Sequence, residues 1–312
     1  MVTSLLSLSK NTKPCVKLHS LHSLKAQNAS ANANTNTNTK NLRIIHFIRH
    51  AEGYHNVNND YKNPAFIDAQ LTPKGIDQCK LLSRQLQTLM EGEGPREKEV
   101  TENNGNNDIY NNDIFDVECI ISSPMRRALQ TAQHSFEHQL QLSNENKMIL
   151  DDNDNDDENN NDNDKKNVQI PFVACEEWRE TVNYLCDQRL PSSQLNQDFP
   201  FVNFDHIQHE HDPIWEKYEQ RHGTHDEFTK VRESKDDKGL RERAESAWKF
   251  IGKRNENCIA VVSHSAFFMH IFTRPELGIV SYEDDDVEKL MTEKPFKNCE
   301  MRSLAFEVLS ID

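Results

Sequence analysis

Four short segments of this sequence carry side chains that suit the chemistry of phosphoryl groups. They contain Arg49-His50, Arg127, Glu180 and His264. An arginine keeps its charge and grips phosphate oxygens with a rigid fork of donors, and an imidazole can attack phosphorus as a nucleophile. We therefore expect His50 to accept a phosphoryl group that the two arginines and the second histidine stabilise.

Two glutamates compete for the role of proton donor. Glu180 lies shortly after the apolar segment 168–174, and Glu177 precedes it by three residues. Either carboxyl group could protonate a leaving oxygen if the pocket raises its pKa, and could later activate water. We expect Glu180 to do so, with Glu177 as the alternative. The non-catalytic interpretation of Glu180 is a surface acid paired with Arg179.

Each of these side chains lies at or near the end of an apolar segment that predicts a buried strand. The segments are 42–48, 117–122, 168–174 and 258–264. Their apolar residues run almost continuously instead of alternating, which is typical of strands covered on both faces. Because the carboxyl ends of parallel strands meet at one edge of a sheet, where ligands bind, the sequence predicts that these distant side chains converge.

Helical segments separate the predicted strands. Thr72-Pro73 and Ser123-Pro124 each pair a capping residue with a proline that suits the first helical position. Further elements are expected at 213–220, 239–254 and 266–273 as helices and at 301–309 as a closing strand. The alternation predicts an α/β fold, a three-layer sandwich with a mostly parallel central sheet.

Composition limits the classes of function. The formal net charge of −15 opposes nucleic acid and anionic membranes as partners, because the summed field repels both. The seven cysteines are scattered without a C-x-x-C pair, which favours free thiols in a reducing compartment. No apolar run reaches the roughly 18 residues of a membrane span. We expect a soluble protein that binds a small phosphorylated substrate, and the sequence leaves the oligomeric state open.

Polar tracts divide the chain. Residues 1–41 contain lysines but no acid, which resembles an organelle transit peptide, and the alternative is a disordered leader without an address. The Asn- and Asp-rich tracts at about 92–113 and 144–167 predict disordered insertions. We expect residues 42–312 to form the catalytic domain. The predicted location is intracellular, in the cytoplasm or in an organelle such as a plastid or mitochondrion.

Two other groups of residues invite a functional interpretation. Arg221-His222-Gly223 repeats the Arg-His pair, but the charged segment before it predicts no buried strand to hold the imidazole. His206, His209 and His211 could chelate a metal, but their loop lacks strand or helix spacing, which favours solvated histidines. We expect neither a metal nor a cofactor.

The ordered occurrence of the four segments resembles the histidine phosphatase superfamily, the group that includes cofactor-dependent phosphoglycerate mutase. Arg49-His50-Ala51-Glu52 with Asn56 is similar to that family's Arg-His-Gly signature and its following asparagine. The other matching segments are Ser123–Ala132, Arg179-Glu180, Val262–Ser265 and Asn298–Arg302. The likeness runs from about residue 43 to residue 309 and is closest to plant and fungal phosphoglycerate mutase-like proteins.

The resemblance implies a phosphoglycerate mutase-like fold and a role for each matching residue. His50 would be the phosphorylated nucleophile, and Arg49 and Asn56 would contact phosphate. Arg127 and His264 would complete the phosphate pocket, and Glu180 would sit at the position of the proton donor. Ala51 departs from the family glycine, and its backbone cannot take a positive φ as freely.

These observations predict a metal-independent phosphomonoester hydrolase that acts on a small phosphorylated metabolite through a phosphohistidine. One alternative is a phosphoglycerate mutase-type phosphotransferase. The segment after Asn56 lacks the residues by which such mutases are expected to hold phosphoglycerate, which favours the hydrolase. Another alternative is a phosphate-binding or docking module with an inactive site, and the intact set of arginines and histidines argues against it.

Overall fold

The computed structural model describes eight stretches of the chain. They are residues 14–32, 42–57, 59–91, 112–141, 170–224, 232–233, 238–273 and 278–309. The expected insertion at 144–167 lies outside the described residues. The insertion expected at about 92–113 does too, except for its last two residues, which begin the 3-10 helix Asn112–Phe115.

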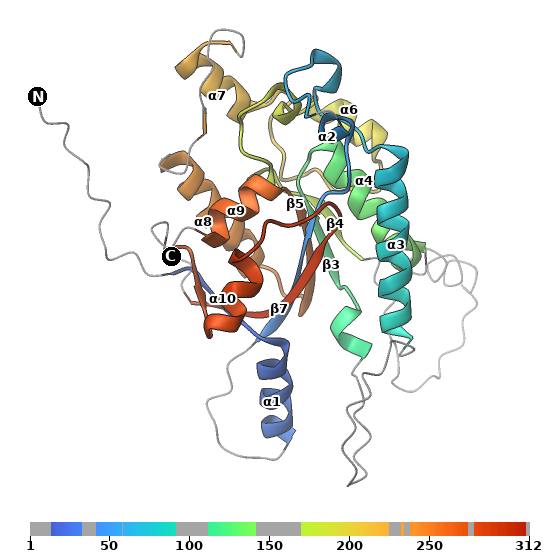
Figure 1. Ribbon diagram of the computed structural model, residues 1–312, viewed down its shortest axis with the longest axis vertical. Helices are drawn as coiled ribbons and strands as arrows, with labels where there is room; N and C mark the ends of the chain where they lie inside the picture. Colours follow the sequence, from blue (N-terminus) through green and yellow to red (C-terminus); the bar gives the residue numbers. More distant parts are fainter. Residues whose placement is uncertain are drawn as a thin grey trace, which may run out of the picture.

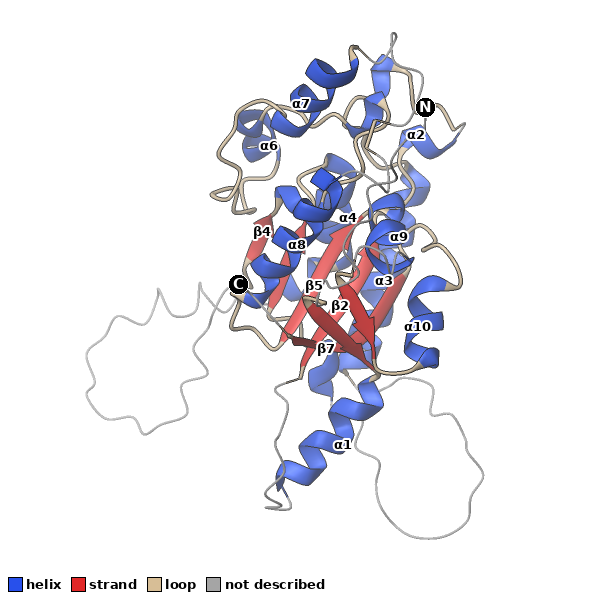
Figure 2. Cartoon of the chain, turned by 90° about the vertical axis from the view of Figure 1, so that its left-hand side faces the viewer, coloured by secondary structure: helices blue, strands red, loops and turns tan. Residues whose placement is uncertain are grey.

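A central sheet of seven strands organises the described residues (Figures 1 and 2). The strands are β1 Val16–His19, β2 Arg43–Arg49, β3 Cys119–Ser122, β4 Phe172–Ala174, β5 Cys258–Ser263, β6 Val280–Tyr282 and β7 Met301–Val308. Their order is β4-β3-β5-β2-β7-β1-β6. Only the pairings of β7 with β2 and with β1 are antiparallel, so the mostly parallel sheet predicted from the sequence is confirmed.

Helices cover both faces of the sheet. They are α1 Leu21–Asn32, α2 Tyr54–Val57, α3 Pro73–Met90, α4 Arg126–Ser135, α6 Ser192–Asp198, α7 Pro213–His222, α8 Lys238–Gly252, α9 Ser265–Thr273 and α10 Asp285–Thr292. In Figure 1, α3 and α4 lie on one side of the sheet and α8, α9 and α10 on the other. The predicted three-layer sandwich is therefore confirmed. Among the described helices, none combines the length and apolar character that a membrane span requires.

Successive side chains of a strand point to opposite faces of the sheet. Because both faces are covered by helices, one apolar layer forms on each face. On one face, Phe47 of β2 packs edge-on against Trp248 of α8 and Phe268 of α9, with ring centroids 5.9 and 5.6 Å apart. On the other face, Ile48 belongs to a second core cluster together with Leu129 of α4. Burial of such side chains contributes about 1.5–3 kcal/mol each, which anchors the strand ends that carry the polar residues.

The predicted helix starts differ in outcome. Thr72 caps α3 as expected, because its hydroxyl accepts from the Gly75 amide at 3.0 Å. The prediction that Ser123 caps the next helix is wrong. That helix, α4, begins two residues later than expected, after Met125, and the Ser123 hydroxyl lies 2.7 Å from His264 Nε2 instead.

The predicted disordered leader at 1–41 is wrong for residues 16–32, which fold. The strand Val16–His19 lies between β7 and β6, with Val16 and Leu18 fully buried, and α1 follows it. A four-residue strand is too short to stand out from a background rich in Lys, Ser and Asn. The strand forms because it pairs with β7, which comes from the far end of the sequence. The local sequence pattern does not predict this pairing.

Candidate active site

Two neighbouring strands deliver the two histidines to one edge of the sheet. Strands β2 and β5 run parallel with Arg49 opposite Ser263, so both end at the same level. The His50 amide donates to the Ser263 carbonyl at 2.9 Å, and the His50 and His264 ring centroids are 5.0 Å apart. The predicted convergence of these residues, separated by more than two hundred positions, is present in the structure.

The surroundings of His50 keep its ring neutral. Its Nδ1 lies 2.7 Å from the Ala51 carbonyl, which can only accept, so Nδ1 carries the proton and Nε2 keeps its lone pair. The ring is 2% exposed. Burial, followed by the charges of Arg127 and Arg49, holds the pKa of His50 well below its usual value. The imidazole therefore stays unprotonated at neutral pH, as nucleophilic attack requires.

His264 is equally buried and presents one free ring nitrogen. Its Nε2 contacts the Ser123 hydroxyl at 2.7 Å, whereas its Nδ1 is buried and has no hydrogen-bond partner in the structure. Burial and the nearby Arg127 and His50 hold the pKa of His264 well below its usual value. This ring nitrogen therefore remains available for a hydrogen bond to a ligand.

The two arginines are held by one or two contacts each and keep an unsatisfied nitrogen. Arg127 donates to the Cys186 carbonyl at 2.7 Å and to Asp187 Oδ1 at 3.2 Å. Arg49 donates to the Phe296 carbonyl at 2.7 Å. The Nε atoms of both side chains are buried without a partner in the structure. Both guanidinium groups lower the pKa of His50, so positive charge faces its ring from β2 and from α4.

His55 is a third imidazole at this site, and the sequence reasoning missed it. It lies in the short helix α2, is 3% exposed, and its ring centroid is 5.5 Å from that of His50. Its Nδ1 has no partner in the structure, and burial together with Arg127 and Arg49 lowers its pKa to about 2. The available signal was its position within the Arg-His motif, directly before Asn56.

Asn56 braces the loop that carries these residues. Its side-chain carbonyl accepts from the Gly53 backbone amide at 3.0 Å, and the Asn56 backbone amide donates to the Gly53 carbonyl at 2.9 Å. These bonds close the turn between β2 and α2. The side-chain NH₂ group of Asn56 is the part that remains suited to the expected contact with phosphate.

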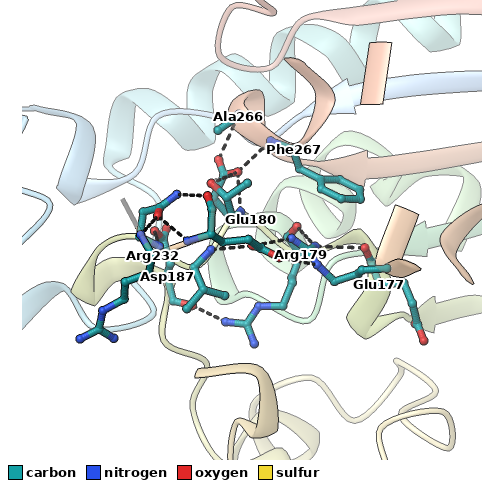
Figure 3. Close-up of polar contacts among 12 residues, drawn as sticks. Glu177, Arg179, Glu180, Asp187, Arg232, Ala266 and Phe267 are labelled. Carbon is teal, nitrogen blue, oxygen red and sulfur yellow. Dashed lines mark hydrogen bonds and ion pairs between the residues drawn. The ribbon is translucent and has the colours of Figure 1, made fainter. Parts of the chain in front are cut away.

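The structure separates the two candidate proton donors (Figure 3). Glu180 lies against the start of α9, immediately after His264, and its carboxylate accepts from the amides of Phe267 at 2.9 Å and Ala266 at 3.3 Å. Glu177 points away from it and accepts from the Cys175 thiol at 3.1 Å. The charge of Glu180 also acts on the pKa of Arg49. Glu180 is therefore the glutamate that shares the edge with the histidines.

The alternative interpretation of Glu180 as a partner of Arg179 is wrong. Arg179 is fully buried and forms its ion pairs with Glu176, at 2.9 Å, and with Asp212. These acids raise the pKa of the guanidinium above its usual value. The carboxyl group of Glu180 instead accepts from backbone amides at the start of α9.

The other sequence candidates lie elsewhere. His222 ends α7 and stacks on Tyr218 with ring centroids 6.1 Å apart, and His206 packs against Phe250 at 4.8 Å. In the part of the chain that the structure covers, no group of three or more His, Cys, Asp or Glu side chains is placed to hold a metal ion.

Comparison with known proteins places the chain among relatives. A phosphoglycerate mutase-like protein of Arabidopsis thaliana is 27% identical over 270 residues, covering 84% of this chain and 83% of the relative. Phosphoglycerate mutase-like protein 2 of the same plant is 25% identical over 332 residues, covering 96% and 79%. The chain is similar to phosphoglycerate mutase-like proteins. This confirms the resemblance predicted from the motifs, although no family model matches the sequence.

Solved structures with a similar arrangement include two phosphatases. A phosphoserine phosphatase from Entamoeba histolytica is 16% identical, with 83% of this chain and 89% of that chain covered and a TM-score of 0.36. A mycobacterial glucosyl-3-phosphoglycerate phosphatase is 13% identical, with 85% and 90% covered and a TM-score of 0.37.

Proposed function

We propose that this protein is a phosphomonoester hydrolase that acts on a small phosphorylated metabolite through a phosphohistidine at His50. The observation that carries the proposal is the state of the His50 ring. Its Nδ1 is fixed by the Ala51 carbonyl, which leaves Nε2 as a neutral nucleophile beside two guanidinium groups. This arrangement suits attack on a phosphate dianion, because the positive charge is already in place when the transferring group arrives.

In the first step, His50 Nε2 attacks phosphorus and the bond to the leaving oxygen breaks. Glu180 protonates that oxygen, and the alcohol leaves. Arg49, Arg127 and His264 bind the equatorial oxygens, and the unsatisfied nitrogens of these side chains supply donors for them.

In the second step, water attacks the phosphohistidine. Glu180, now a carboxylate, accepts a proton from the water, and inorganic phosphate leaves as the His50–phosphorus bond breaks. No protein metal takes part in either step. We therefore expect hydrolysis to continue in the presence of a chelator, and a loss of activity that only zinc or magnesium restores would contradict the metal-free mechanism.

Hydrolysis of a generic aryl phosphate tests the proposal directly. Wild-type protein should release phosphate and show one added phosphoryl group by intact-mass spectrometry after rapid quenching. His50→Ala should lose both signals. Labelling that persists in His50→Ala would place the nucleophile elsewhere.

An assay with phosphoglycerate, run with and without a bisphosphate primer, separates the hydrolase from a mutase. A mutase retains its phosphohistidine and depends on a bisphosphate primer, whereas a hydrolase releases phosphate without one. If the protein isomerises phosphoglycerate only with a primer and releases little phosphate, it is a mutase and not a hydrolase. Absence of both reactions, together with retained phosphate binding, would indicate an inactive module.

A further inference from the structure

Two cysteines meet beside the loop that carries His50. Cys79 lies in α3 and is fully buried, and Cys299 lies just before β7 and is partly exposed. Their Sγ atoms are 4.0 Å apart. Residues 220 positions apart in the sequence thus bring two free thiols into contact.

The backbone of Cys299 supports the peptide that carries the nucleophile. Its amide lies 3.1 Å from the Arg49 carbonyl and 3.3 Å from the His50 carbonyl, and donates to both. The neighbouring Asn298 side chain donates to the same His50 carbonyl at 3.2 Å. Cys299 has a φ of 58°, in the left-handed region that non-glycine residues seldom occupy. A movement of Cys299 is therefore transmitted to His50 through hydrogen bonds.

The second cysteine packs against the same loop. Cys79 belongs to a small apolar cluster with Ala51 and Leu71, and Cys299 packs against this cluster. Ala51 is the residue whose carbonyl fixes the His50 tautomer. A covalent link between the two sulfurs would consequently constrain both the peptide before the imidazole and the carbonyl that orients it.

We propose that Cys79 and Cys299 form a redox modification site, at which a peroxide converts the two thiols into a reversible disulfide beside the loop that carries His50. One thiolate attacks a peroxide oxygen, which gives a sulfenic acid as the O–O bond breaks, and water or an alcohol leaves. The second thiol then attacks the sulfenic sulfur, an S–S bond forms and water leaves. The two sulfurs together lose two electrons to the peroxide, and a small dithiol returns them.

The surroundings of the pair favour this reaction. The hydrogen bond between the two cysteines lowers the pKa of the Cys79 thiol and raises the pKa of the Cys299 thiol, so Cys79 is the one that attacks as a thiolate. Partial exposure of Cys299 gives a small peroxide access from its side. By contrast, burial raises the pKa of the Cys119 thiol to about 12, so that cysteine serves as an unreactive control.

The disulfide should slow turnover. Closing the gap from 4.0 Å to the bond length of about 2 Å requires Cys299 or α3 to move toward the other. Misplacement of a reacting group by about 1 Å can cost about 100-fold in rate. We expect oxidation to reduce aryl phosphate hydrolysis at least about tenfold and a dithiol to restore it.

The experiment treats the full chain with hydrogen peroxide and follows two readouts. Peptide mapping by mass spectrometry should find a cross-link between the peptides containing Cys79 and Cys299, and the hydrolysis rate should fall in parallel. Cys79→Ser and Cys299→Ser should each form no cross-link and lose the reversible inhibition. The matched variant Cys119→Ser should behave as wild type in both readouts.

The cross-link readout stands apart from the proposed function, on which only the rate readout rests. A cross-link in a protein that hydrolyses no phosphate ester would support the modification site and overturn the hydrolase. If both thiols remain alkylatable after peroxide treatment that oxidises other thiols in the sample, the modification site is refuted. Equal inhibition of wild type, Cys79→Ser and Cys299→Ser would also refute it.

Discussion

At the scale of single residues, the site is built from side chains that are buried and incompletely satisfied. Four side chains near His50 each retain a buried nitrogen without a partner in the structure: Arg49, Arg127, His55 and His264. The two arginines and His55 lower the pKa of His50, and the rings of His55 and His264 lie next to its ring. Buried polar groups are normally satisfied, so such a concentration is expected where a ligand completes the hydrogen bonding. An anion with several acceptor oxygens fits four donors or donor-capable rings.

The geometry of Arg127 should matter more than its charge. We expect Arg127→Lys to lower kcat for aryl phosphate hydrolysis about 100-fold, because an ammonium group keeps the charge but loses the fork that contacts Cys186, Asp187 and the transferring group. Steady-state kinetics measures this. Arg126→Lys, one residue earlier in the same helix, is the control and should stay near wild type. Equal losses of kcat in both variants would contradict a specific role for Arg127.

His55 should make stability depend on pH. Its pKa is lowered to about 2 in the folded protein, so the folded state leaves it neutral while the unfolded chain protonates it below about pH 6.5. Stability from this residue is therefore full above the unfolded pKa and is lost as the pH falls. From pH 6.5 to 5 the loss is about 2 kcal/mol. Urea unfolding should show that His55→Gln lacks this part of the decline, and identical pH slopes would contradict it.

At the scale of elements, the start of α3 packs closely against the loop that follows His50. A Cβ at Gly75 would lie 2.2 Å from the Glu52 carbonyl oxygen, so only glycine allows this approach. The Thr72 cap and the Lys74 contact with Glu52, at 2.7 Å, hold the same junction. Helix α3 thereby fixes the position of the loop that follows β2.

Gly75→Ala should consequently damage both stability and activity. The clash is with backbone, which cannot rotate away, and we expect a loss of about 1–3 kcal/mol in the free energy of unfolding together with reduced turnover. Chemical denaturation and the aryl phosphate assay measure the two effects. Gln85→Ala, an exposed position on the same helix, is the control. A Gly75→Ala protein as stable and active as that control would show that the junction is not tight.

At the scale of the whole molecule, the sheet is completed by both ends of the described chain. Strand β1 pairs with β7 and β6, and His19 reaches Glu307 at 3.0 Å and Glu283 at 3.4 Å. The fully buried Val16 and Leu18 belong to the same core cluster as the residues around Trp248. The amino-terminal segment thus supports the half of the sheet farthest from β3 and β4.

Deletion of residues 1–32 should therefore destabilise the protein. Loss of two buried apolar side chains alone removes about 3–6 kcal/mol, and the edges of β6 and β7 become unpaired. Denaturant unfolding measures the change, with deletion of residues 1–13 as the control that keeps β1. If the unfolding curves of the two deletions coincide, residues 14–32 do not stabilise the domain, and its boundary lies near residue 41 as the sequence predicts.

The sequence by itself determined the local features. Apolar runs predicted β2, β3, β4, β5 and β7, because strands buried on both faces must be apolar throughout, and Thr72-Pro73 marked a helix start. The polar residues at the ends of those runs predicted the edge where His50, Arg127 and His264 meet.

Only the tertiary structure decided which residues contact one another across that edge. Three contacts depend on strand register and helix packing between segments far apart in the chain: that of His55 with His50, that of Glu180 with the start of α9, and that of Cys79 with Cys299. A local pattern records how a segment buries its side chains. It does not record the positions of its neighbours, because these follow from the packing of all the layers together.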